Sequence, residues 1–141
     1  MKFWENQKVI SSCYTELMKP VCAKYGLTQM EFDIIMFLHH YPERDTAADI
    51  VKLRCFTKSH VSASVKTLTE KGLVTTRHTD GNRKFIRISL TDAVRRIIEE
   101  GEKAQKDFGA AILKGFTADE IVECVNMYER LCKNARETLD R

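Results

Sequence analysis

The sequence predicts a mainly α-helical protein that carries one small β-hairpin. Apolar side chains recur at helical spacing in several segments, whereas residues 73–79 and 83–90 are rich in β-prone residues. Asp80-Gly81-Asn82, a typical hairpin turn, separates these two stretches. With 141 residues, 43% of them hydrophobic, the chain is long enough to bury a core without a disulfide or metal staple.

Three helices are expected in the amino-terminal part of the chain. The first covers residues 4–24, and Pro20 is expected to kink or end it. The second begins after the capping box Thr28-Gln-Met-Glu31 and stops at Tyr41-Pro42. A third, shorter helix is expected to begin near Thr46.

The fourth expected helix follows Thr57, which has the character of an N-cap. Its apolar stripe is narrow and consists of Val61, Val65 and Leu68. The side chains on its other faces are short, polar or basic. Gly72 stands where helices often end in a left-handed residue.

Two further helices are expected after the hairpin. Thr91 is expected to cap a long one, and the capping box Thr117-Ala-Asp-Glu120 opens the last. The predicted order is therefore four helices, a hairpin and two helices.

Positive charge is concentrated in the middle of the chain. The segment from Arg54 to Arg87 holds eight Lys or Arg and two acids, a net of +6, whereas the whole chain is only +3 and the remainder is therefore −3. Such clustering favours a polyanionic partner.

Two short helices followed by a hairpin form the order of a winged helix-turn-helix. In that arrangement the second helix enters the major groove of double-stranded DNA, and a basic hairpin tip reaches phosphates or the minor groove. The sequence therefore predicts a DNA-binding surface made of Thr57, Lys58, Ser59, His60, Ser62, Ser64, Lys66, Arg77, Asn82, Arg83 and Lys84.

The two ends of the chain predict a homodimer. Residues 27–91 form the expected winged helix-turn-helix domain, and residues 1–26 and 92–141 a helical dimerisation region with apolar stripes. A two-fold dimer would place two reading helices about 34–36 Å apart, one DNA turn, on a pseudo-palindromic operator.

The stretch from Leu27 to Thr91 resembles the MarR family of bacterial transcriptional regulators. The resemblance lies in "LTQMEFDIIMFL", "VSASVKTLTEKGLVTTR" and the closing "RISLT". It implies a regulator of transcription, most simply a repressor relieved by a ligand. The family's wing usually holds Asp-x-Arg, where this chain has Asn82-Arg83-Lys84, so Lys84 would meet phosphate as a point charge with Arg83 as a substitute.

The resemblance also implies candidates for effector sensing. Small phenolic or lipophilic effectors of the family bind between the lobes, where Tyr14, His39, His40 and Tyr41 are available; packing at a helix end is the alternative role of these residues. One branch of the family senses peroxide through a cysteine in the first helix, which makes Cys13 a redox candidate. Cys55 is a second candidate because it lies between Arg54 and Lys58 near a helix start, and incidental thiols are the alternative for both.

Several other classes are not favoured. No signal-peptide pattern is visible, the longest apolar run is Ile34–Leu38, and the five cysteines lack a CxxC pair, so a cytoplasmic protein without a membrane partner, metal or cofactor is expected. A non-specific architectural module and a Cys–His enzyme, using Cys55 and His60, are the remaining alternatives, and no catalytic residue is expected.

Overall fold

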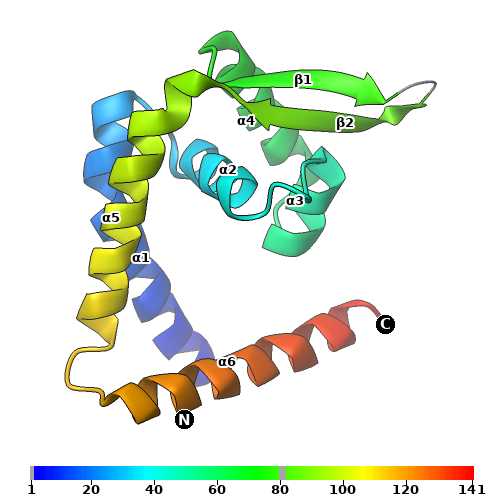
Figure 1. Cartoon of the computed structure of the whole chain (residues 1–141). Coiled ribbons are helices and arrows are strands. Elements are labelled where there is room, and N and C mark those ends of the chain that lie inside the picture. Colours follow the sequence, from blue (N-terminus) through cyan, green and yellow to red (C-terminus); the bar gives the residue numbers. More distant parts are fainter. Residues whose placement is uncertain (1, 80–81) are drawn as a thin grey trace. The chain divides into compact units, whose positions relative to one another are not determined.

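The structure is a computed structural model that describes residues 2–79 and 82–141 (Figure 1). It confirms a mainly α-helical chain with one β-hairpin. The chain divides into two compact units, Met1–Phe108 and Gly109–Arg141. Within the described residues, no helix combines the length and apolar character that crossing a membrane requires. The elements are α1 (Phe3–Tyr25), α2 (Gln29–His40), α3 (Ala47–Arg54), α4 (Lys58–Glu70), β1 (Val74–Thr79), β2 (Asn82–Leu90), a 3-10 turn (Asp92–Val94), α5 (Arg95–Ile112) and α6 (Ala118–Leu139).

Helix α1 continues through Pro20. It ends only at Gly26, which adopts the left-handed conformation with φ 63°. The buried side chains of Met18 and Val21 lie on either side of the proline, so core packing holds the helix together where one backbone hydrogen bond is missing. The expectation that Pro20 could end this helix is therefore wrong.

Helix α2 forms the centre of the first unit. Seven of its 12 residues are buried, and a helix that is apolar on most sides must be surrounded by other elements. The core around it draws on every neighbouring element of the unit, through Met18 of α1, Ile50 of α3, Leu68 of α4, Ile88 of β2 and Ile97 of α5.

The hairpin is antiparallel and is anchored at its base. Val74 pairs with Leu90 and His78 with Ile86, and the register slips between His78 and Thr79. Val74 is almost fully buried, so the base of the hairpin belongs to the core, while its far end extends away from α2–α4 (Figure 1).

Thr91 stands at the N-cap position of a 3-10 turn, but its side chain makes no capping hydrogen bond, contrary to expectation. Its hydroxyl donates a hydrogen bond to the carbonyl of Gly72 at 2.7 Å, and its N–H donates to the carbonyl of Leu73 at 3.0 Å. These bonds join the end of β2 to the end of α4, because Gly72 has the left-handed φ of 73° and turns the chain back. A 3-10 turn, Asp92–Val94, leads into α5 instead.

Helices α2 and α5 approach each other closely at Gly101. A methyl group placed on Gly101 would lie 2.9 Å from Met36 Sδ and 2.9 Å from the Phe32 ring. The Phe32 ring is fully buried and cannot move aside, so only glycine fits this position without rearrangement.

We expect Gly101→Ala to lower the free energy of unfolding by about 1–2 kcal/mol, because overpacking outweighs the gain in helix propensity. Urea unfolding followed by circular dichroism measures this change. Gly109→Ala is the matched control in the same helix, since nothing lies within 4 Å of its added methyl, and it should stabilise by about 0.5–1 kcal/mol. Equal effects of the two substitutions would contradict the close approach.

Candidate nucleic-acid interface

Helix α4 presents a polar outer face, as the sequence predicts. Thr57 caps the helix, and its side chain accepts a hydrogen bond from the His60 N–H at 3.4 Å. Val61, Val65 and Leu68 are buried against the core, which turns the remaining positions outward. We call the exposed set the reading face: Lys58, Ser59, His60, Ser62 and Lys66.

Ser64 lies at the edge of this face. It is half-buried because it neighbours Val61 and Leu68, three residues before it and four after it on the helix. Its side chain therefore borders the packed side of α4, and Ser59 and Ser62 are more accessible to a partner.

A partly buried ion pair fixes the end of α4 to the start of α2. The Glu31 carboxylate is 3% exposed, and Lys71 Nζ lies 3.2 and 3.1 Å from its two oxygens. The same ammonium donates to the Gly26 carbonyl at 2.7 Å. Glu31 also completes the predicted capping box with Thr28, so this carboxylate is satisfied from two elements at once.

A second ion pair fixes the base of the hairpin. Arg87 Nη1 lies 2.7 Å from Asp45 Oδ1, and the Ile88 N–H donates to the Asp45 carbonyl at 2.7 Å. Thr46 forms an isolated bridge with Arg87, so the segment before α3 runs beside β2. The hairpin is thereby held against the helix-turn-helix by both backbone and side-chain bonds.

The remaining hairpin candidates differ in what the structure describes. Arg77 is exposed on β1, opposite Arg87 in the register. Asn82, Arg83 and Lys84 belong to β2, but their side chains lie outside the described residues.

Ion pairing removes part of the positive charge counted from the sequence. Three of the eight basic residues between positions 54 and 87 meet acids that lie outside that segment: Arg54 with Asp33, Lys71 with Glu31 and Arg87 with Asp45. Among the side chains of this segment that the structure describes, the cations exposed without such a pair are Lys58 and Lys66 on α4 and Arg77 on β1.

Asp33 is a largely buried acid on α2. Burial raises its pKa, although the hydrogen bond from Gln29 and the Arg54 guanidinium 3.8 Å away act in the opposite direction. The Arg54 guanidinium also lies over the Phe56 ring, 5.2 Å from its centroid. These contacts tie α2 to the turn between α3 and α4.

Two of the predicted effector residues share one hydrogen-bonded chain with α5. The Tyr14 hydroxyl accepts a hydrogen bond from Gln105 Nε2 at 2.9 Å, and Gln105 Oε1 lies 3.2 Å from His40 Nε2. Burial raises the pKa of Tyr14, which packs edge-on against Phe108. Tyr14 and His40 therefore meet through a residue that the sequence did not single out.

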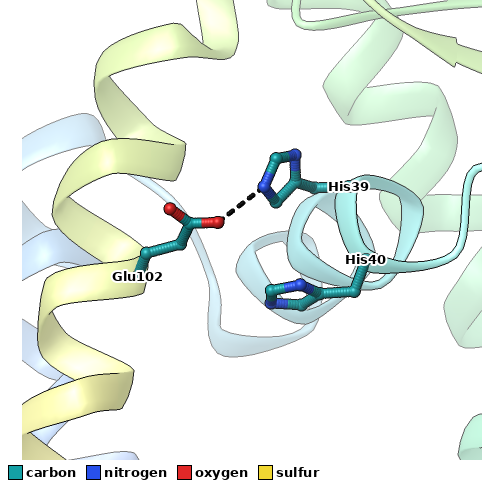
Figure 2. Close-up of side chains that lie close together, drawn as sticks. All are labelled: His39, His40 and Glu102. Carbon is teal, nitrogen blue, oxygen red and sulfur yellow. Dashed lines mark hydrogen bonds and ion pairs between the residues drawn. The ribbon is translucent and has the colours of Figure 1, made fainter.

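His39 and Tyr41 lie in different surroundings. His39 Nε2 lies 2.6 Å from Glu102 Oε1 of α5, with His40 beside it (Figure 2). Tyr41 instead packs on Phe37, with ring centroids 5.2 Å apart, and is 51% exposed. The structure thus groups His39 and His40 and leaves Tyr41 at the end of α2.

The two redox candidates have different environments. Cys13 is half-buried on α1, and Cys55 is exposed. Cys55 adopts a left-handed backbone with φ 54° at the end of α3, so it forms the turn into α4. Both cysteines are free thiols.

Residues 25–84 match the family model described as "MarR family". This span holds α2, α3, α4 and β1, and therefore the reading face and both of its ion-pair anchors at Glu31 and Asp45. This segment is a MarR-family domain. The resemblance seen in the sequence is thereby confirmed.

Solved MarR-family structures share the fold. The putative MarR family transcriptional regulator from Listeria monocytogenes, complexed with 26mer DNA, is 16% identical, with a TM-score of 0.88 over 98% of this chain and 91% of that one. MarR is 16% identical, with a TM-score of 0.84 over 99% and 95%. BpsR of Bordetella bronchiseptica, described as regulated in DNA binding by 6-hydroxynicotinic acid, is 16% identical, with a TM-score of 0.76 over 94% and 99%.

Sequence reasoning missed the partners that hold this MarR-family domain together. The sequence indicates Glu31 only as part of a capping box, and Lys71 and Arg87 only as part of the general positive charge. Glu102 and Gln105 lie more than 60 residues from His39 and His40, so no local spacing could have linked them. The sequence offered one signal for these partners: Glu31 is an acid next to the apolar residues of α2, so it was a candidate for a paired charge.

We expect Lys71→Met to lower the free energy of unfolding by about 2–3 kcal/mol, because it leaves the Glu31 carboxylate buried without its cation. The loss is smaller than for a fully buried pair, since the Lys71 side chain is 33% exposed. Chemical denaturation without DNA measures this change. Lys66→Met on the exposed face of α4 is the matched control and should change stability by less than about 0.5 kcal/mol. A Lys71→Met protein as stable as the wild type would show that the pair contributes nothing.

Proposed function

We propose that this chain is a sequence-specific regulator of transcription that binds double-stranded DNA as a homodimer on a pseudo-palindromic operator. The observation that carries the proposal is the reading face of α4, which is free of acids, exposed, and held rigidly by the Glu31–Lys71 pair. Small polar side chains allow a helix to approach base edges in the major groove. The Listeria monocytogenes relative is described in complex with 26mer DNA.

The hairpin supplies the phosphate contacts in this proposal. Its base is fixed by Asp45 and Arg87, so the basic residues beyond it, Arg77, Arg83 and Lys84, are carried by a stiff support. Contacts with phosphate add affinity without sequence choice, whereas Ser59, His60 and Ser62 of α4 would select the sequence.

The exposed apolar faces of the two terminal regions support a dimer. In α6, all of which the structure describes, no residue is buried within one chain. A helix of 22 residues with a strongly amphipathic pattern is only marginally stable unless its apolar face packs against something. We therefore assign residues 1–26 and 92–141 to dimerisation, and residues 27–91 to DNA binding.

Regulation by a small aromatic or lipophilic effector completes the proposal. BpsR is described as regulated by 6-hydroxynicotinic acid, and in this chain Tyr14, His39 and His40 lie where α1 and α2 meet α5. An effector there needs a coupling of only about 1–3 kcal/mol to change DNA affinity 5–150-fold. The chain would act as a cytoplasmic, non-enzymatic repressor that the effector releases.

We expect Arg83→Ala and Lys84→Ala each to weaken binding to all duplexes. Each substitution should also reduce the slope of log K against log salt by about one for every phosphate that is no longer neutralised. A symmetric dimer loses two such contacts, so its slope should fall by about two. Ser62→Ala should instead change which sequences are selected from a random duplex pool. Fluorescence anisotropy over a salt series and sequencing of the selected pool measure the two effects.

Lys8→Ala on α1 is the control for removal of one positive charge, and its salt slope should equal that of the wild type. Wild-type salt slopes for both wing variants would refute the wing assignment. If unrelated DNA competes as well as the selected duplex at physiological salt, the chain is an architectural module without sequence choice.

We expect Val125→Glu and Leu131→Glu to convert a dimer into a monomer, because each places a charge on the apolar face of α6. Sedimentation velocity measures the mass, which should change from twice the 16.3 kDa of one chain to that value. Asn126→Glu, on the opposite face of the helix, introduces the same acid and should leave the dimer intact. A wild-type monomer at micromolar concentration would rule out the dimer.

A further inference from the structure

His39, His40 and Glu102 bring three metal-ligating side chains together from two helices (Figure 2). One ligand atom from each residue lies within 4.8 Å of the other two. We propose that these residues bind a first-row transition-metal dication, with Zn²⁺ as the best chemical match. Two imidazoles and one carboxylate form a donor set that zinc uses in proteins, with the remaining position open to water or another ligand.

The separations fit a cation after small side-chain movements. Ligand atoms around tetrahedral zinc lie roughly 3.3 Å apart, as follows from metal–ligand distances near 2.0–2.2 Å. His39 Nε2 and Glu102 Oε1, now 2.6 Å apart, must separate slightly, and the His40 ligand atom already lies within 4.8 Å of both. All three side chains are exposed, and the side chains of His39 and Glu102 are 37% and 49% accessible, so such movements meet little resistance.

Gln105 places a fourth possible ligand atom, an amide oxygen, beside the cluster. Its Oε1 lies 3.2 Å from His40 Nε2, and its Nε2 donates to the Tyr14 hydroxyl at 2.9 Å. The bond to Tyr14 orients the amide so that its oxygen faces the histidine. A side-chain partner that orients a ligand in this way typically changes metal affinity by about 10–100-fold.

The position in the fold also favours a cation. His39 and His40 form the last turn of α2, where the unpaired carbonyl groups give the helix end a partial negative charge. The carboxylate comes from α5, where Glu102 directly follows Gly101, the residue at which the two helices touch. A cation bound here would cross-link α2 to α5 beside this close approach.

The test uses the full-length, metal-free protein and titrates it with Zn²⁺ by isothermal calorimetry. We expect one Zn²⁺ per chain, and His40→Ala and Glu102→Gln should each weaken binding by at least about tenfold. His78→Ala and Glu99→Gln are the matched controls: His78 is exposed on β1, and Glu99 is exposed on α5 about one turn before Glu102. Both should retain wild-type affinity.

Co²⁺ as a spectroscopic probe separates this site from the five cysteines. A site of nitrogen and oxygen ligands gives weak visible bands without the intense near-ultraviolet absorption of a cobalt–thiolate bond. The melting temperature should rise with Zn²⁺ in the wild type and not in His40→Ala. Unchanged affinity in the His40 and Glu102 variants, a thiolate band, or no binding of either ion would overturn the proposal, whatever the outcome of the DNA experiments.

Discussion

A single buried carboxylate holds together the helix-turn-helix part of this chain. Glu31 accepts a hydrogen bond from the Thr28 N–H at the start of α2 and forms an ion pair with Lys71 at the end of α4. A buried charge is tolerated only when its partners are in place, so the geometry of both helix ends is fixed together. Because Lys71 also binds the Gly26 carbonyl, the end of α1 is drawn into the same arrangement.

Acids from outside the basic segment pair with three of its eight basic residues. Arg54, Lys71 and Arg87 are engaged in ion pairs with Asp33, Glu31 and Asp45, which lie on α2 or just before α3. These pairs hold the elements of the domain together. The unpaired charge then falls on α4 and on the hairpin, the two elements that a winged helix-turn-helix directs toward DNA.

Local patterns in the sequence were sufficient for the elements but insufficient for their connections. The capping residues Thr28, Thr57 and Thr117 were recognisable because each acts on an amide three residues away. Thr91 looks the same in the sequence, yet its hydroxyl bonds to Gly72, 19 residues earlier. Side-chain chemistry alone does not distinguish a local acceptor from a distant one.

The same difference between local patterns and long-range contacts applies to the candidate site. The reading face followed from the narrow apolar stripe of α4, since burial of three residues fixes the direction of the others. Ser64 is less accessible than the sequence suggests. It lies at the edge of the apolar stripe, where the exposure of a side chain depends on which elements pack beside the helix. The cluster of His39, His40 and Glu102 required knowledge of how α2 meets α5, which no spacing encodes.

Helix α2 contacts both the helix proposed to read DNA and the residues proposed to bind an effector. Its first turn holds Lys71, and hence the end of α4, while its last turn meets α5 through His39 and His40. A helix of 12 residues is about 18 Å long and does not bend easily when most of its side chains are packed. We therefore expect a ligand that changes the contact of α2 with α5 to move both ends of α2 together, against the ion pair of Glu31 with Lys71. Under the proposed function, we therefore expect any coupling between the two regions to pass through α2.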